Sequence, residues 1–151
     1  MRITFFIFIL SLSFSSCQKD KFTSAPQISF KEFRPNQGNN RDGVTNQPYL
    51  VFEITDGDGD LDTDSSKIFV RNTLTNKVDS SLRFPELGSS AGKNFKGEVQ
   101  VGLFSVMAGR DLPSTQRPYV DTLSFEVYVN DKAKNKSNVI IAGPFYYFTL
   151  P

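Results

Sequence analysis

The chain has 151 residues, and its 17 lysines and arginines nearly balance its 16 aspartates and glutamates. This balance leaves no electrostatic footprint for nucleic acid or for an anionic membrane surface, so neither is an expected partner. The chain has no histidine and a single cysteine. A Ser-His-Asp triad, a Cys-His dyad and the histidine-containing zinc sites are therefore excluded, and carboxylates are the remaining catalytic groups.

The first seventeen residues have the pattern of an export signal. Arg2 precedes an apolar run over residues 3–14, two serines and Cys17. The run is too short to span a bilayer, and small residues stand where a signal peptidase cleaves. Residues 14–17, Phe-Ser-Ser-Cys, resemble the lipobox of bacterial lipoproteins, although Phe14 replaces the usual Leu or Val. The resemblance implies that residues 1–16 are a cleaved signal peptide and that Cys17 carries covalent lipid, which anchors the chain durably when two or more acyl chains are present.

The segment after the cysteine predicts the destination of the chain. Residues 18–21, Gln-Lys-Asp-Lys, resemble the short charged signal that sends some Gram-negative lipoproteins to the outer face of the outer membrane. We therefore expect a lipid-anchored protein at the cell surface, with the periplasmic face as the alternative if these residues are only a solvated linker. Residues 17–26 are the predicted lipidated cysteine and flexible tether, because they are polar and include Ser24 and Pro26.

The rest of the chain, residues 27–151, has the size of one domain and the pattern of short strands. Fifteen phenylalanines and five tyrosines favour a β-rich core, and no segment has helical periodicity. Seven strands are predicted, at residues 27–34, 50–55, from 68 onward, 78–84, 95–103, 122–129 and 139–150, with Gly143-Pro144 as an irregularity in the last. The prediction is an all-β fold, a single antiparallel β-sandwich.

A polar turn before the last strand carries a resemblance to a known fold. Residues 128–138, YVNDKAKNKSN, resemble the turn between strands F and G of bacterial immunoglobulin-like domains, where Asp-x-Ala-Gly-Asn-x-Ser is common. Lys134 replaces the glycine that most readily takes a left-handed conformation. The resemblance implies an immunoglobulin-like antiparallel β-sandwich of about seven strands.

An acidic loop follows the second predicted strand. Its five aspartates stand at every second position, with Gly57 and Gly59 between the first three; they are Asp56, Asp58, Asp60, Asp62 and Asp64. This spacing resembles calcium loops, because Ca²⁺ takes about six to eight oxygen ligands and glycine lets the loop curl around the ion. Leu61 and Lys67 stand where an EF-hand requires Gly and Glu, so the loop is not an EF-hand. Leu61 is expected to turn inward.

An immunoglobulin-like topology places the loop after the sixth strand beside the acidic loop, so Asp131 joins the predicted calcium ligands Asp56, Asp58, Asp60 and Asp62. Two alternatives remain open. Lys132, Lys134 and Lys136 could neutralise the aspartates and leave a solvated acidic turn, or the carboxylates could form a catalytic cluster. The same topology puts the tether at this end of the domain.

The opposite end would display the loop 35–48 and the connection 104–118. Met107, Arg110 and Arg117 in this connection are the predicted partner-binding residues, since exposed apolar and arginine side chains are typical of interface hot spots. The alternative is that the apolar residues of this connection cover the bottom of the core.

Together these patterns predict a noncatalytic surface lipoprotein that acts as a binding or scaffolding module for an unknown protein or glycan, with Ca²⁺ as an expected stabiliser. One alternative is a carbohydrate-binding accessory protein of nutrient uptake, in which Tyr49, Tyr119 or Tyr146 stack on sugar rings. The absence of tryptophan counts against it. Another is a carboxylate-dependent hydrolase that uses the loop aspartates and strand glutamates, which are Glu53, Glu86, Glu98 and Glu126.

Overall fold

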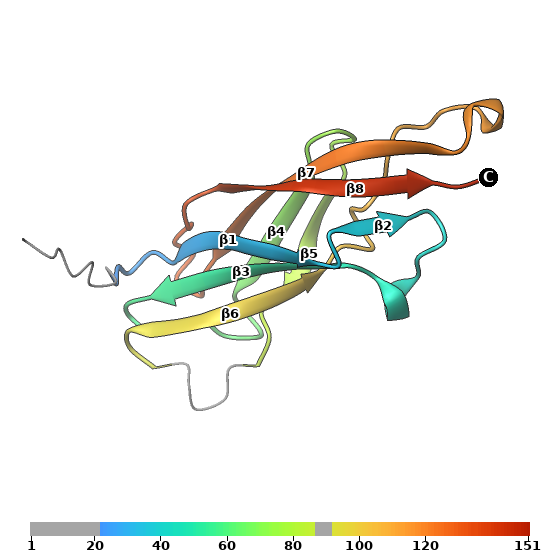
Figure 1. Cartoon of the computed structure of the whole chain (residues 1–151). Helices are drawn as coiled ribbons and strands as arrows, with labels where there is room; N and C mark the ends of the chain where they lie inside the picture. Colours follow the sequence, from blue (N-terminus) through green and yellow to red (C-terminus); the bar gives the residue numbers. More distant parts are fainter. Residues whose placement is uncertain (1–21, 87–91) are drawn as a thin grey trace, which may run out of the picture.

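The computed structural model describes residues 22–86 and 92–151, and in these residues the chain is all-β. Figure 1 shows two sheets. The strands are β1 (Gln27–Arg34), β2 (Gln37–Asn39), β3 (Tyr49–Asp56), β4 (Lys67–Asn72), β5 (Val78–Arg83), β6 (Phe95–Gly102), β7 (Tyr119–Asn130) and β8 (Ile140–Thr149). Two short 3₁₀ turns are also present, and no helix in the described part is long and apolar enough to cross a membrane. The predicted signal peptide and Cys17 lie outside the described residues.

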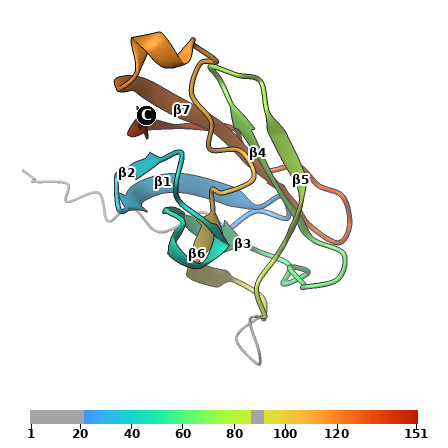
Figure 2. The same ribbon diagram turned by 90° about the vertical axis from the view of Figure 1, so that its right-hand side faces the viewer.

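The strands form a three-stranded sheet in the order β1-β3-β6 and a five-stranded sheet in the order β2-β8-β7-β4-β5. Neighbouring strands of the described chain are antiparallel, apart from the parallel pair of β2 and β8. Figure 2 shows the two sheets as separate layers, with β1, β3 and β6 in one and β4, β5 and β7 in the other. The predicted all-β sandwich is confirmed, and each of the seven predicted strands is present.

The loop 35–48 was predicted to be irregular, and this prediction was incomplete because the loop contains β2. Its strand sequence, Gln-Gly-Asn, is too short for periodicity and has low β-propensity. The strand forms because β8 presents unpaired backbone groups at its edge, and Gln37 and Asn39 stand opposite Tyr146 and Phe148. A Cβ on Gly38 would lie 2.5 Å from Met107 Sδ, so a larger residue there would require the methionine side chain to move.

The predicted irregularity in the last strand is confirmed. Leu123 pairs with Phe145 and Phe125 with Ala142, so the register between β7 and β8 shifts beside Gly143. A proline follows that glycine, and proline has no N–H to contribute to the ladder.

Aromatic rings from both sheets meet in the core. Phe33 of β1 contacts Phe125 of β7 and Phe145 of β8 in edge-to-face geometry, with ring centroids 5.9 and 5.2 Å away, and the latter two rings are 5.9 Å apart. Such geometry adds to the stabilisation that comes from burying the rings. Leu61 is only 2% exposed, so its predicted inward orientation is confirmed.

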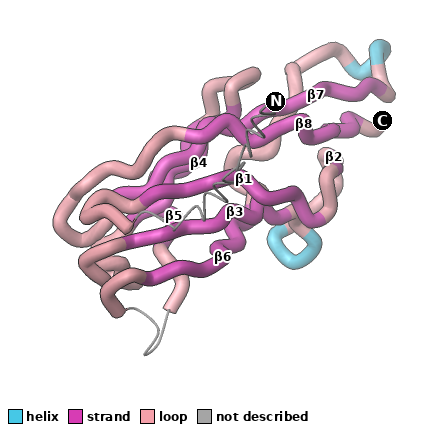
Figure 3. The backbone as a smooth tube through the Cα atoms, turned by 60° about the vertical axis from the view of Figure 1, so that its left-hand side comes forward, coloured by secondary structure: helices cyan, strands magenta, loops and turns pink. Residues whose placement is uncertain are grey.

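The sandwich has two distinct ends. We call the end where β1 begins and β3 and β7 finish the tethered end; there Gly57 N–H donates to Thr23 O over 2.8 Å. The opposite, free end carries β2 and the C-terminus (Figure 1). Figure 3 shows that both 3₁₀ turns, Val44–Asn46 and Ser114–Gln116, lie toward the free end. Thr23, which belongs to the predicted tether, therefore contacts the domain.

Candidate functional site

Three carboxylates converge at the tethered end. Asp56 is the last residue of β3, Asp60 lies in the loop that follows, and Asp131 is the first residue after β7. One carboxylate oxygen of each lies within 4.8 Å of the other two. Because β3 and β7 belong to different sheets, the cluster joins the two layers of the sandwich. The predicted meeting of the acidic loop with the loop after β7 is confirmed.

Hydrogen bonds between the two loops fix this arrangement. Ala133 N donates to Asp60 Oδ2 over 3.0 Å, and Lys132 N donates to Asp60 O over 3.4 Å. Asp131 Oδ1 and Oδ2 accept hydrogen bonds from N and Nδ2 of Asn135, at 2.7 and 2.8 Å. The turn that carries these groups has Lys134 at φ 69°, so lysine adopts the left-handed conformation that glycine favours in the related turns.

Buried carboxylate oxygens in this cluster lack donors. Asp56 is 0% and Asp131 is 1% exposed. Asp56 Oδ2 accepts a hydrogen bond from Gly59 N, whereas the buried atoms Asp56 Oδ1 and Asp60 Oδ1 have no hydrogen-bond partner among the residues that the structure describes. A buried acceptor without a donor is unfavourable, and an ionised one more so. These oxygens point to a positively charged ligand.

The protonation behaviour of the cluster agrees with this reasoning. Burial, together with the smaller contributions of the charges of Asp58 and Asp60, raises the pKa of Asp56 to about 6. Burial also raises the pKa of Asp60, as do the charges of Asp131 and Asp58. The ionised cluster therefore lacks compensating charge.

The donor set is entirely oxygen, which suits a hard cation such as Ca²⁺ or Mg²⁺. Backbone oxygens and water can complete an irregular shell of about six to eight ligands, which Ca²⁺ accepts more readily than Mg²⁺. The residues present fit a calcium ion that is coordinated by Asp56, Asp60 and Asp131.

The other predicted ligands differ in position. Asp58 is exposed and lies beside Asp60, close enough to raise its pKa. Asp62 falls outside the three-carboxylate cluster, because its Oδ1 accepts hydrogen bonds from Ser65 N at 2.6 Å and Ser66 N at 3.1 Å. These bonds lower the pKa of Asp62, the one from Ser65 N contributing most. Asp62 thus caps a turn.

The lysines proposed as a rival to the metal have other contacts. Lys132 Nζ lies 3.7 Å from Asp62 Oδ2. Lys136 Nζ lies 3.8 Å from the ring centroid of Tyr128, where a cation–π interaction stabilises it. The contacts made by these two lysines do not neutralise the three clustered carboxylates.

The predicted partner-binding residues at the free end differ in how exposed they are. Met107 is 8% exposed and belongs to the hydrophobic core. Arg110 donates from Nε to Asp121 Oδ1 over 2.6 Å and from its backbone N to Oδ2 over 2.8 Å. Arg117 is half-buried. The side chain of Arg110 is still 55% exposed. A partner-binding surface here remains a prediction, and Arg110 would be its main contact residue.

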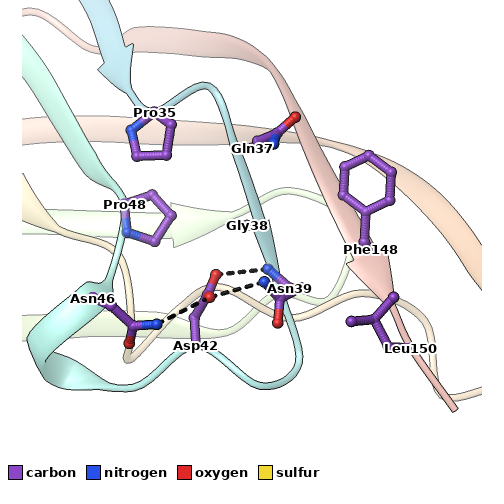
Figure 4. A pocket seen from close by; sticks show the side chains of 9 residues that line it. All are labelled: Pro35, Gln37, Gly38, Asn39, Asp42, Asn46, Pro48, Phe148 and Leu150. Atoms are coloured by element: carbon purple, nitrogen blue, oxygen red, sulfur yellow. Dashed lines mark hydrogen bonds between the residues drawn. The ribbon is translucent and has the colours of Figure 1, made fainter.

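A pocket of about 340 Å³ lies at the free end. Figure 4 shows Pro35 and Pro48 on one side and Phe148 on the other. Asp42 accepts hydrogen bonds from Asn39 N at 2.7 Å and Asn39 Nδ2 at 2.9 Å. The full lining of the pocket is Pro35, Gln37, Gly38, Asn39, Asp42, Asn46, Pro48, Phe148 and Leu150. The sequence analysis missed this pocket because it forms only when β2 pairs with β8.

Two of the side chains named for the alternative functions, Tyr119 and Glu98, make contacts within the domain. Tyr119 OH donates to Arg110 O, and neither Tyr49 nor Tyr146 lines the pocket at the free end. Glu98 forms an ion pair with Lys31, whose hydrogen bond lowers the pKa of Glu98. A general acid needs a raised pKa instead.

The strand order and the two packed layers define the described chain as a β-sandwich. The chain matches no protein-family model, no curated protein and no solved structure. Its function is therefore argued from the acidic cluster and from the difference between the two ends.

Proposed function

We propose that the chain is a noncatalytic surface lipoprotein, lipid-anchored at Cys17 in the outer membrane, whose sandwich is a binding or scaffolding module with a structural Ca²⁺ at its tethered end. One observation carries the metal: Asp56, Asp60 and Asp131 bring carboxylate oxygens within 4.8 Å of one another, and two buried oxygens there have no donor within residues 22–86 and 92–151.

The ion would act as a cross-link. Asp56 and Asp60 come from the end of one sheet and Asp131 from the end of the other, so a shared cation holds the two layers together where the chain enters the domain. Calcium bound at about a hundred times its Kd would stabilise the fold by about 2.7 kcal/mol. A noncatalytic role is favoured because the cluster is buried between loops, with its two most buried members closed to substrate.

Calorimetric titration with Ca²⁺ tests the metal site. We expect binding by the wild type, no measurable binding by Asp131→Asn, and wild-type binding by Asp64→Asn, which removes an exposed aspartate of the same loop outside the cluster. Equal binding by the two variants would refute the proposed ligand set.

Metabolic labelling tests the anchor. Cells that express the full chain are grown with radiolabelled palmitate, and the protein is followed through membrane fractionation and through protease treatment of intact cells. We expect label, outer-membrane location and protease access for the wild type, and loss of the label in Cys17→Ser. Protease resistance of the labelled protein in intact cells would favour the periplasmic face.

A second candidate function is glycan binding, and the pocket at the free end favours it. Apolar walls from Pro35, Pro48 and Phe148 stand beside the polar groups of Asn39 and Asp42, and this mixture suits a small polar ligand with an apolar face. Glycan-array binding that disappears in Phe148→Ala would support this function, and absence of binding across the array would count against it.

A further inference from the structure

The loops that supply the acidic cluster also hold the tether. Gly57 directly follows Asp56, and its N–H donates to Thr23 O over 2.8 Å. Asn135, which donates two hydrogen bonds to Asp131, also places Nδ2 3.5 Å from Ser24 O. Asp56 is therefore connected to the tether through Gly57, and Asp131 through the side chain of Asn135.

The fit between loop and tether is close. A Cβ on Gly57 would lie 2.7 Å from Thr23 O and 3.0 Å from Thr23 C, so only glycine lets the two backbones approach this far. Thr23 Oγ1 donates to Ala25 O over 2.6 Å, and Pro26 is buried. The residues from Thr23 to Pro26 therefore form a built contact with the acidic loop.

The same loops must respond to the metal. Three neighbouring carboxylates repel one another when they are ionised without a cation, which favours separation of the two loops. Separation moves Gly57 and Asn135, and both hold the tether. A cation that draws the loops together favours the arrangement in which the tether is bound.

We propose that calcium binding at the cluster fastens the tether residues Thr23 to Pro26 onto the domain, so that occupancy of the site sets how far the domain stands from its membrane anchor. The inference rests on the proposed calcium site and on the proposed lipid at Cys17.

The effect on reach follows from chain geometry. With the tether fastened, Thr23 lies six residue-to-residue steps after the anchor at Cys17, and the extended chain spans at most about 20 Å. With the tether released up to Gln27, the ten steps from Cys17 span about 34 Å. Calcium would therefore draw the domain toward the membrane by up to about 14 Å and restrict its orientation.

Amide hydrogen exchange of the full chain, purified in detergent micelles and followed by NMR, tests the coupling. The Gly57 amide reports the bond to Thr23, and the Leu103 amide, which donates to Pro48 O over 3.0 Å at the free end, is the internal control. If release of the tether also releases the ion, Ca²⁺ at about a hundred times its Kd should slow Gly57 exchange about 100-fold. Leu103 exchange should change much less.

A matched pair of variants isolates the contact. Gly57→Ala places a Cβ against the Thr23 carbonyl, whereas Gly43→Ala adds a Cβ whose nearest neighbour is 3.5 Å away. We expect Gly43→Ala to bind Ca²⁺ as the wild type does and Gly57→Ala to bind it more weakly, because the coupling is reciprocal. Calcium protection of the amide at position 57 should be lost in Gly57→Ala and kept in Gly43→Ala.

The outcomes separate the two proposals. Calcium binding by calorimetry without slower exchange at Gly57 in the wild type would overturn the coupling and leave the metal site intact. Undiminished calcium protection in Gly57→Ala would also overturn it, because the tether contact would then not be the source of protection. Absence of calcium binding by the wild type would refute both proposals. If Gly57→Ala does not fold, the effect of Ca²⁺ on Gly57 exchange in the wild type still tests the coupling.

Discussion

Replacement of Asp56 by asparagine should stabilise the fold when calcium is absent, and this gain should vanish or reverse when calcium is present. Asparagine has the same shape and can still accept the hydrogen bond from Gly59 N, but it carries no charge. It therefore removes a carboxylate that is 0% exposed and has one oxygen without a partner. Without metal this substitution relieves a cost, and with metal it removes a ligand.

The magnitudes follow from the pKa and from mass action. Burial raises the pKa of Asp56 from 3.8 to about 6. At about 1.4 kcal/mol for each pKa unit, ionisation at neutral pH costs the metal-free fold up to about 3 kcal/mol. Calcium at about a hundred times its Kd adds about 2.7 kcal/mol to the wild type and little to a variant without the site. Asp56→Asn should thus be up to about 3 kcal/mol more stable in chelator, and this advantage should largely vanish or reverse in calcium.

Thermal unfolding followed by circular dichroism measures whether the wild type or Asp56→Asn is the more stable protein, in chelator and in calcium. For a domain of this size we expect about 3 to 5 °C in Tm for each kcal/mol, so calcium should raise the wild-type Tm by roughly 10 °C. Asp64→Asn, the exposed control, should respond to calcium as the wild type does. A lower Tm for Asp56→Asn than for the wild type in chelator would refute the reasoning, because the buried charge would then be compensated without metal.

Three further predictions concern stability. The pKa of Asp56 is about 6 in the folded state and 3.8 in the unfolded chain, so the folded state binds this proton more tightly. In chelator, the unfolding free energy of the wild type minus that of Asp56→Asn should therefore fall as the pH rises from 3.8 to about 6. Urea unfolding in a pH series checks the sign. Arg110→Ala leaves the buried carboxylate of Asp121 without its cation and should lower the unfolding free energy by about 1 to 3 kcal/mol, whereas an unchanged urea midpoint would show that the pair contributes nothing. Gly143→Ala places a Cβ 2.6 Å from Ser124 Oγ and should cost about 1 to 3 kcal/mol in the same assay; a neutral result would mean that the bulge adapts freely.

The strands were predictable because their signals are local. Leu123, Phe125, Val127 and Val129 are all fully buried on one face of β7, and their alternation in the sequence has the period of a strand. β2 gave no such signal, because its pairing is decided by the open edge of β8, more than a hundred residues away in sequence. Short edge strands of this kind depend on tertiary contacts that a local pattern does not contain.

The acidic cluster was predictable in part. The spacing of the aspartates and the implied topology brought Asp56, Asp60 and Asp131 together correctly. Asp62, which was predicted as a further ligand, lies outside the three-carboxylate cluster, and its carboxylate accepts a hydrogen bond from Ser65 N. The serines after Asp62 are a local signal of this turn.

Asn135 is the functional residue that the sequence analysis did not identify. Its position four residues after Asp131 is the available signal, because a side chain at that spacing can close the turn by bonding back to the aspartate. The contact with Ser24 has no comparable signal, since it joins residues 111 positions apart. Contacts at that separation depend on how β1 and β7 are arranged in the sandwich. The same arrangement that makes the contact of Thr23 and Ser24 with the domain hard to predict from sequence also brings these residues against the loops of the acidic cluster, and this is why the tethered end of the domain is best tested as one unit.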